Sequence, residues 1–248
     1  MHELEQRAAV RGIETHVLAQ GEDAAVLARD AEAESLGVAG GDGSLAPVAE
    51  VALERDLPFV VVPYGTRNHF ARDLGLDRDD PLAAVEAFSG VERSIDVGRV
   101  NGQLFLNNVA LGLYAKLLHR RERHRSRRDA LARIRALLLL LRERGKEQDL
   151  SLDGGRLAAS VVLVANNAYE LDLFNVGERE RLDEGRLYLY VAHGWRPQTW
   201  EERSGTAFTL ESDTRLQAAM DGEPVELEAP LHFSIEQRAL RVLVPPDA

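Results

Sequence analysis

The sequence GVAGGDGSLAPVAEV, residues 37–51, runs from a short apolar segment through a glycine-rich turn into a predicted helix. The glycines of GGDG let the backbone come close to a bulky, charged group. The helix that starts after them adds unpaired N–H groups and the positive end of its dipole, which together suit a phosphate. A plain tight turn would use the same residues, so the rest of the chain has to decide between the two.

Strands and helices alternate in the first part of the chain. Helix-forming composition covers residues 3–11 and 23–34, and THVLA (residues 15–19) between them is typical of a short strand. The apolar run PFVVVPYG (residues 58–65) is typical of a strand buried on both faces. This spacing predicts a parallel α/β sheet, and ligands bind at the carboxyl ends of such strands.

After about residue 95 the pattern changes to that of a β protein. The segment SIDVGRVNGQLFLNNVALG (residues 94–112) predicts a hairpin whose turn is Asn101-Gly102. A long helical segment is expected over residues 112–147, and short strands of alternating polarity follow from residue 149. We therefore expect an α/β domain followed by an antiparallel β-sandwich or barrel.

The composition is that of an ordinary globular protein, with 45% hydrophobic and 29% charged residues. The net charge of −11 argues against indiscriminate binding of nucleic acid, and the lack of cysteine argues against disulfides and thiolate zinc sites. We find no run of about 18 apolar residues, as a membrane span needs, and no signal peptide. We therefore expect the protein in the cytoplasm. An acidic chain that binds ATP needs Mg²⁺, local N–H groups or arginines to offset the repulsion.

A second unusual stretch, PYGTRNHFARDLGL (residues 63–76), also follows an apolar strand. Gly65 allows a close approach, Thr66 and Asn68 offer short polar groups, and the arginines offer guanidinium groups for phosphate. The same residues fit a helix entry in which Thr66 or Asn68 is the N-cap and Phe70 packs inward. Both interpretations can hold at once.

A late MDGEPV (residues 220–225) places two carboxylates, Asp221 and Glu223, around one glycine. At this spacing one carboxylate can take a proton from a substrate hydroxyl while the other contacts a metal-bound water. The segment DGEP is also a good β-turn, and a turn without catalytic work stays an alternative.

GGDGS, VVPYGTRNHFARDLGL, IDVGRVNGQLFLNNVALGLYA and MDGEPV occur in this order. Together they resemble the diacylglycerol kinase catalytic family, the bacterial lipid kinases that are similar to sphingosine and ceramide kinases. The resemblance covers nearly the whole chain. It implies a Rossmann-like α/β nucleotide-binding domain over residues 1–96, to which a tail of about residues 236–248 can return, and an antiparallel β-sandwich domain over residues 97–248. ATP is expected between them.

The resemblance also implies roles for individual residues. The catalytic base falls on Asp221 or Glu223, and Asp96 is a further candidate for the acidic network around the metal. The residues implied in binding the nucleotide lie in the first two motifs: Gly40, Gly41, Asp42, Gly43, Ser44, Thr66 and Asn68.

RLDEGRL (residues 181–187) resembles the turn that holds a structural Mg²⁺ in this family. The implied ligands are the carboxylate of Glu184 and the backbone carbonyls of Arg181 and Arg186. The family's usual residue at position 184 is aspartate, so a simple hairpin turn is an equal alternative. The basic segment 119–135 can contact anionic lipid headgroups or be a solvated helix face.

One feature departs from the family. Its members begin with a strand that ends in an Asn-Pro-containing, Gly/Ser-rich phosphate loop, whereas this sequence starts at the following helix. THVLA also lacks the family's usual ATP-contacting threonine. We expect the fold to be kept, and the activity of the chain to depend on this segment.

These observations predict an ATP- and Mg²⁺-dependent lipid kinase that phosphorylates a diacylglycerol-like or long-chain lipid alcohol. It would be cytoplasmic and act at the inner membrane face, with no nucleic-acid partner, and a homodimer is possible. The alternatives are an NAD kinase-like enzyme, which shares the GGDG turn, and a nucleotide- or lipid-binding protein without turnover. The set of carboxylates at Asp42, Asp221 and Glu223 argues against the last.

Overall fold

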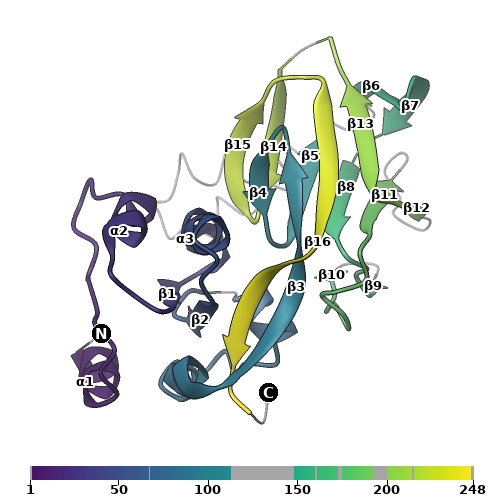
Figure 1. The fold of residues 1–248 in the computed structure, drawn as a ribbon. Helices are drawn as coiled ribbons and strands as arrows, with labels where there is room; N and C mark the ends of the chain where they lie inside the picture. Colours follow the sequence, from purple (N-terminus) through teal and green to yellow (C-terminus); the bar gives the residue numbers. More distant parts are fainter. Residues whose placement is uncertain are drawn as a thin grey trace, which may run out of the picture. The chain divides into compact units, whose positions relative to one another are not determined.

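The computed structural model describes residues 2–66, 68–112, 148–159, 161–172, 175–192, 200–213 and 215–246 (Figure 1). The chain forms two compact units. The first comprises Met1–Val97, Glu180–Asp183 and Gln237–Ala248, and the second comprises Gly98–Arg179 and Glu184–Glu236. The basic segment 119–135 and most of the predicted helix 112–147 lie outside the described residues.

The first unit is an α/β structure. Strands β1 (Leu36–Gly40) and β2 (Phe59–Pro63) pair in parallel, and the end of β16 (Leu231–Val244) joins β2 in parallel at Val242 and Leu243. The start of β3 (Val91–Val100) completes this sheet, because β3 pairs with β16. The helices are α1 (His2–Val10), α2 (Ala24–Asp30), α3 (Asp42–Glu54), α4 (His69–Asp73) and the 3-10 helix η1 (Ala83–Ser89). The predicted parallel pairing is confirmed.

Strand β2 forms the centre of the core of this unit. All five of its residues are buried, as expected for a strand covered on both faces. Helix α3 packs against β1 and buries Leu45, Val48 and Ala52, which recur at helical spacing on one face. Helix α1 adds Leu4 to an apolar cluster with β2 and η1. This packing fixes the carboxyl ends of β1 and β2, where the first two motifs begin.

The predicted strand at residues 15–19 does not form. These residues are exposed and belong to no sheet, and Val17 and Leu18 are each about half exposed. A strand is stable only when its backbone pairs with a neighbour and one face is covered. In the described part of the chain β1 pairs with β2 alone, so nothing pairs with residues 15–19. The prediction from composition was wrong for this segment.

The second unit consists of antiparallel β-sheets. One sheet has the order β12-β11-β8-β5-β14-β15. In the other, the first part of β16 pairs with β13, β13 with β6, and β6 with β7, while β3 pairs with β4. Strands β9 and β10 form a separate pair. The bounds of these strands are β4 Gln103–Phe105, β5 Asn108–Gly112, β6 Gln148–Leu152, β7 Gly155–Ala159, β8 Val161–Asn166, β9 Leu171–Asp172, β10 Asn175–Val176, β11 Leu187–Ala192, β12 Trp200–Gly205, β13 Ala207–Glu211, β14 Leu216–Met220 and β15 Glu223–Leu227.

Both larger sheets contribute to one apolar core, as in a sandwich. On β11, Leu187, Leu189 and Val191 join this core, while Tyr190 lies in a smaller cluster with Tyr169. The alternation follows from the two faces of a strand. Pro224 lies in β15 at the edge of its sheet, where a missing N–H is tolerated.

Three hairpins of this unit turn on Asn-Gly or Asp-Gly pairs with positive φ at both residues. They are Asn101-Gly102, Asp153-Gly154 and Asp221-Gly222. These are the residues that two-residue turns of this kind require. The predicted hairpin at Asn101-Gly102 is confirmed by the pairing of β3 with β4.

Strand β16 runs without a break where the sequence pattern predicts two short strands. Its irregular point is Arg238, which has φ 49°. The buried carboxylate of Asp96 accepts the N–H of Arg238 at 2.7 Å, and the N–H of Asp96 donates to the carbonyl of Leu182. In this structure Asp96 therefore fixes the backbone at Arg238 and Leu182. Its role in an acidic network around the metal stays a prediction.

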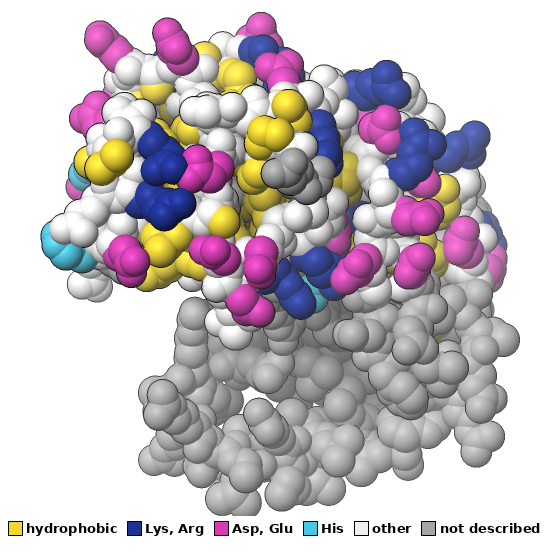
Figure 2. Space-filling view, turned by 90° about the horizontal axis from the view of Figure 1, so that it is seen from below, with side chains coloured by type: hydrophobic (Ala, Val, Ile, Leu, Met, Phe, Trp, Pro, Cys, Tyr) yellow, Lys and Arg dark blue, Asp and Glu magenta, His cyan; other side chains and the backbone are white. Residues whose placement is uncertain are grey.

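Figure 2 shows acidic, basic and apolar side chains interspersed over the described part of one face of the molecule. Among the described residues, no helix is both long enough and apolar enough to cross a bilayer.

Candidate functional site

The glycine-rich turn lies between β1 and α3. Gly41 precedes the first helical residue, Asp42, with φ −94° and ψ 174°. Ser44 holds the turn, because both its N–H and its hydroxyl donate to the carbonyl of Gly41, at 2.9 and 2.7 Å. A Cβ at Gly40 would lie 2.1 Å from the Ser44 hydroxyl oxygen, so a side chain there would require the Ser44 hydroxyl to move. The turn thus presents backbone at the N-terminus of a 13-residue helix.

The second motif follows β2 and touches the first turn through its backbone. The N–H of Tyr64 donates to the carbonyl of Gly40 at 3.1 Å. A Cβ at Gly65 would lie 2.4 Å from the Cα of Gly41, which no side chain can tolerate. Two glycines from different motifs therefore meet directly. The two turns are in contact through their backbones.

Asn68 closes the loop of the second motif. Its side chain accepts the N–H of Gly65 at 2.9 Å and donates to the carbonyl of Gly65 at 3.1 Å. Asn68 itself is buried and adopts the left-handed conformation, which asparagine tolerates better than most residues. It makes no capping bond to α4. Thr66, within the loop that Asn68 closes, is exposed.

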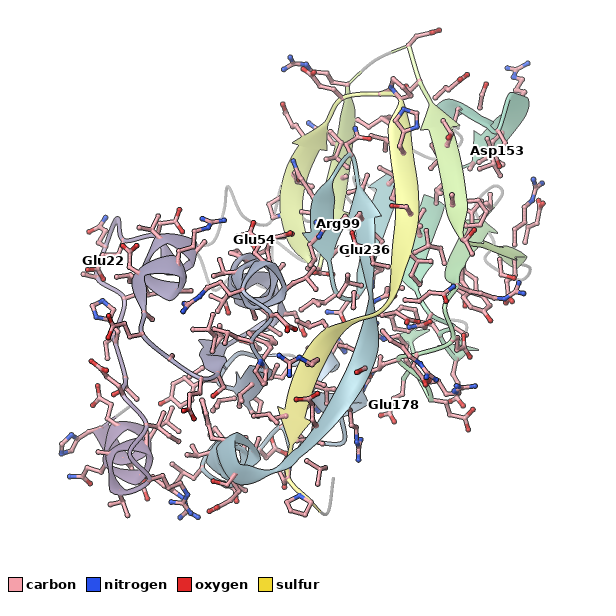
Figure 3. The ribbon with its side chains drawn as sticks, in the orientation of Figure 1. Glu22, Glu54, Arg99, Asp153, Glu178 and Glu236 are labelled. Carbon is pink, nitrogen blue, oxygen red and sulfur yellow. The ribbon has the colours of Figure 1, made fainter. Side chains whose placement is uncertain are left out.

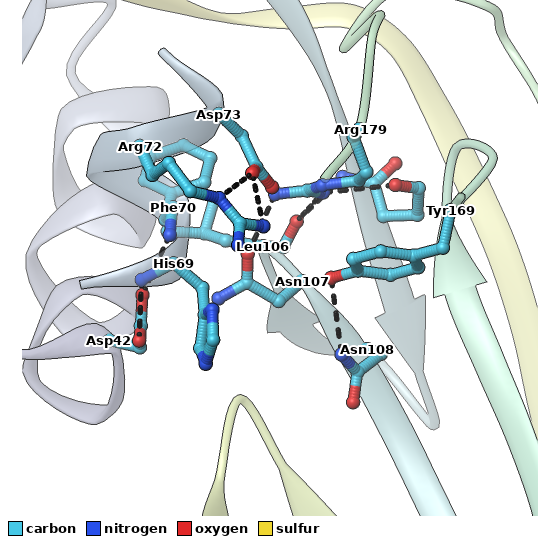
Figure 4. Close-up of polar contacts among 11 residues, drawn as sticks. Asp42, His69, Phe70, Arg72, Asp73, Leu106, Asn107, Asn108, Tyr169 and Arg179 are labelled. Carbon is cyan, nitrogen blue, oxygen red and sulfur yellow. Dashed lines mark hydrogen bonds and ion pairs between the residues drawn. The ribbon is translucent and has the colours of Figure 1, made fainter. Parts of the chain in front are cut away.

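Asp42 joins the two motifs. Its carboxylate accepts the N–H groups of His69 and Phe70, at 3.0 and 2.8 Å, and so caps the N-terminus of α4 (Figure 4). The sequence predicts a local cap at Thr66 or Asn68, but the cap comes from α3. Phe70 is buried, as that helix entry requires. The contact of Asp42 with Mg²⁺, ribose or a phosphate-bound water stays a prediction.

The acidic motif lies in the second unit, on the hairpin between β14 and β15. Asp221 is 6% exposed, and its two carboxylate oxygens accept three backbone N–H groups. The donors are Leu106 at 2.8 Å, Asn107 at 2.7 Å and Asn108 at 3.1 Å. Burial raises the pKa of Asp221 to about 6, against the lowering effect of these bonds and of Arg179. Glu223, two residues on, is exposed.

Arg179 contacts the same segment, residues 106–108, through the carbonyl and side-chain oxygens of that segment. The sequence motifs did not identify Arg179 as a site residue. Its buried guanidinium donates to the carbonyls of Leu106 and Asn166 and to the side chain of Asn107, at 2.8, 3.0 and 2.6 Å (Figure 4). It also lies over the ring of Tyr169, 5.3 Å from the ring centre. The Asn107 position falls inside a recognised motif, but no local sequence signal marks Arg179.

The predicted Mg²⁺ turn is held by hydrogen bonds. The carboxylate of Glu184 accepts the N–H of Ala168 at 3.2 Å, and the carbonyl of Arg186 accepts the N–H of Asn167 at 3.0 Å. The side chain of Arg181 pairs with Asp183. Among the described residues, no three His, Cys, Asp or Glu side chains gather as a metal site would require. Since a carbonyl or carboxylate oxygen can accept twice, Mg²⁺ at Glu184 with the carbonyls of Arg181 and Arg186 stays a prediction.

The predicted site residues thus fall into two groups. The glycine-rich turn, Thr66 and Asn68 lie in the first unit, and Asp221, Glu223 and Glu184 lie in the second. Within each group, residues far apart in sequence come together. The common cleft expected for both groups stays a prediction.

Comparison with known proteins identifies relatives for both parts of the chain. Residues 1–100 match the diacylglycerol kinase catalytic domain. A protein of Bacillus subtilis named "Diacylglycerol kinase" is 38% identical over 111 residues, which are 42% of this chain and 37% of that protein. A Pseudomonas aeruginosa protein named "Probable lipid kinase YegS-like" is 28% identical across 97% of this chain and 87% of its own length.

A solved structure shares the fold. The crystal structure of a diacylglycerol kinase from Bacillus anthracis str. Sterne matches with a TM-score of 0.69 at 18% identity, over 99% of this chain and 92% of that one. These findings confirm the predicted resemblance to this family, through residues 1–100, and the predicted fold class, an α/β domain followed by an antiparallel β-sandwich.

Proposed function

We propose that this chain is an ATP-dependent lipid kinase, because residues 1–100 match the diacylglycerol kinase catalytic domain. It transfers the γ-phosphoryl group of ATP to the hydroxyl of a diacylglycerol-like or other long-chain lipid alcohol. The lipid oxygen bonds to the γ-phosphorus, the bond from that phosphorus to the bridging oxygen breaks, and ADP leaves. The hydroxyl proton passes to a carboxylate of the protein. The products are a lipid phosphate and ADP.

The observation that carries this proposal is the direct contact between the first two motifs. Gly41 and Gly65 meet at a distance that excludes any side chain, and Asp42 ties the start of α3 to the start of α4. A surface of backbone at a helix N-terminus is a means of binding phosphate. We assign residues 40–44 and Thr66 to the nucleotide phosphates, with Asn68 holding the loop around Gly65. Residues 1–96, with the tail from about residue 236, would form the ATP-binding domain.

We assign the proton transfer to the pair Asp221 and Glu223. Asp221 has a pKa of about 6 and is ionised at neutral pH. Its oxygens already accept three N–H groups, whereas the carboxylate of Glu223 lies on an exposed residue at the start of β15. A proton acceptor must reach the substrate hydroxyl, so exposure favours Glu223 for that contact and leaves Asp221 to hold the turn.

Mg²⁺, when bound, would neutralise the charge of the β- and γ-phosphates. Glu184, with the carbonyls of Arg181 and Arg186, would hold a separate structural Mg²⁺. A long-chain acceptor resides in a bilayer, so we propose that the protein works from the cytoplasm at the inner membrane face.

Transfer of label from ATP tests the function. The full chain is incubated with Mg²⁺, ATP labelled at the γ-phosphate, and mixed micelles that contain a diacylglycerol, a ceramide or a sphingoid base, with NAD as a separate acceptor. We expect label in a lipid phosphate. Label in NAD alone would make the chain an NAD kinase-like enzyme. Binding of ATP by calorimetry with no label in any acceptor would make it a binding protein without turnover.

A further inference from the structure

A group of buried polar side chains in the second unit is left unexplained by the motifs. Arg179 is 3% exposed, and Asn107 and Asn166 are buried with it. The side chain of Asn166 donates to the carbonyl of Leu106 at 3.0 Å, the same oxygen that Arg179 contacts. The N–H of Asn166 donates to the carbonyl of Asn107. The group therefore surrounds the carbonyl side of residues 106–107.

The turn at residues 106–108 lies between a buried cation and a buried anion. Its carbonyl and amide oxygens face Arg179 and Asn166, and its three N–H groups face the carboxylate of Asp221. Asn107 meets both charges, through its side chain to Arg179 and its N–H to Asp221. Peptide dipoles aligned in this way strengthen each other's hydrogen bonds in a medium of low dielectric constant.

We propose that Arg179 is a positioning residue for phosphoryl transfer. It holds the turn at residues 106–108, whose N–H groups hold Asp221, and thereby fixes the hairpin that presents Glu223. The proposal rests on the proposed function, because Arg179 can position a catalytic group only if phosphoryl transfer takes place at the hairpin of Glu223. Arg179 itself is buried, so it would affect the reaction only indirectly, by holding the turn at residues 106–108.

Stability alone does not explain this arrangement. A buried ionic group is often no more stabilising than well-packed apolar side chains of the same size. The Asn101-Gly102 and Asp153-Gly154 hairpins form at exposed positions of the same unit. An Asp-Gly hairpin needs no such burial. The planar fork of arginine, however, reaches two carbonyls and an amide oxygen at fixed angles, which suits a role in placing backbone.

The test compares R179M, which removes the charge and the fork, and R179K, which keeps the charge alone, with R99M as control. Arg99 is a partly buried arginine of the same unit that pairs with Glu236 at 2.5 Å (Figure 3). Two quantities are measured for each protein: kcat and the KM for ATP, and hydrogen exchange of the N–H groups of residues 106–108.

We expect R179M to lower kcat by about 10²-fold, the effect of a misplacement near 1 Å, with the KM for ATP changed by less than about twofold. Exchange at residues 106–108 should accelerate by about tenfold or more, because without Arg179 the turn no longer holds those N–H groups firmly against the carboxylate of Asp221. R179K should lie between R179M and the wild type in both measurements. R99M should leave both unchanged.

The proposal is overturned if R179M leaves exchange at residues 106–108 as in the wild type, or if kcat falls only in proportion to the folded fraction. If R179M does not fold, R179K decides between these outcomes by the same two measurements. If the wild type phosphorylates no acceptor, the proposed function fails and the assigned catalytic role of Arg179 fails with it. In that case exchange in R179K still shows whether Arg179 holds the turn.

Discussion

Two hairpins of the second unit have the same turn and different surroundings. Asp153-Gly154 and Asp221-Gly222 have nearly identical φ angles, 49° and 82° against 49° and 86°. Asp153 is exposed at the β6–β7 hairpin, and its carboxylate accepts one N–H, from Thr209 at 3.0 Å (Figure 3). Asp221 is buried and accepts three.

The difference separates what a turn requires from what a site requires. The positive φ values explain Asp-Gly at both positions. They do not explain why the carboxylate of Asp221 is buried, although burial disfavours its charged form and so raises its pKa. A buried charge must be compensated, and the compensation here comes from residues 106–108 and Arg179. The burial of this carboxylate, and not of the one at Asp153, supports our proposal that Asp221-Gly222-Glu223 is the functional turn.

The largest expected difference between the two hairpins is in the kcat of their variants. We expect E223Q to lower kcat for lipid phosphorylation by about 10²–10⁴-fold, the usual effect of losing general-base help. We expect D221N to lower kcat by about 10²-fold, because the turn that presents Glu223 is then misplaced. Affinity for ATP should change little, since neither carboxylate is assigned to the nucleotide. D153N is the matched control and should have the kcat of the wild type. Equal rates for D221N and D153N, measured as initial velocities, would remove the distinction between the hairpins.

The stability of the protein should depend on pH through the carboxyl group of Asp221. The folded state raises the pKa of Asp221 from 3.8 to about 6, so folding favours its protonated form. Its stabilising contribution is therefore full below pH 3.8 and is lost as the pH rises through about 6. The loss amounts to at most about 3 kcal/mol.

Denaturant unfolding from pH 4 to 7 measures this effect as the difference between the wild type and D221N. The free energy of unfolding of the wild type should fall relative to that of D221N as the pH rises. A flat difference would contradict the raised pKa of the buried Asp221.

The carboxylate of Asp42 accepts two backbone N–H groups, between the one of Asp153 and the three of Asp221. D42A should lower the free energy of unfolding by about 1–2 kcal/mol, because α4 loses its only side-chain cap among the described contacts. D42N keeps one acceptor oxygen and should lose less. D79A, at an exposed turn residue of the same unit, serves as control. ATP affinity, measured by calorimetry, should weaken with D42A, and unchanged stability in D42A would contradict the capping role.

The smallest expected effect concerns the predicted structural Mg²⁺. If Glu184 and its neighbouring carbonyls bind the ion, EDTA should lower the unfolding free energy by about 1 kcal/mol, or about 2–4 °C in Tm. The variant E184A should start from the lower Tm and show no response to EDTA. D183N, which changes the adjacent carboxylate, should keep the response. A wild-type melting curve that ignores EDTA would leave the turn as a hydrogen-bonded hairpin.

The sequence predicts local features well and distant ones poorly. The strands β1 and β2, the glycine-rich turn and the hairpin at Asn101-Gly102 follow from residues adjacent in the chain. The cap of α4 could not be found this way, because Asp42 lies 27 residues before its first donor partner, His69. Residues 15–19 have the composition of a strand but lack a neighbour, which composition does not reveal.

The same limit applies to the candidate site. Asp221 and Glu223 were identified because the motif places them two residues apart. Arg179 was missed because its partners, Leu106 and Asn107, lie more than 70 residues away. Burial and hydrogen bonding, which are properties of the folded chain, distinguish Asp221 from Asp153, and the dipeptide Asp-Gly is the same in both.

The most direct test of the central claim is the stoichiometry of the reaction at the functional turn. The wild type, E223Q and D153N are incubated with Mg²⁺, ATP and vesicles containing a diacylglycerol, and both ADP and lipid phosphate are quantified. The account predicts one lipid phosphate for each ADP with the wild type and D153N, and neither product above background with E223Q. Release of ADP without lipid phosphate, or full product formation by E223Q, would contradict it.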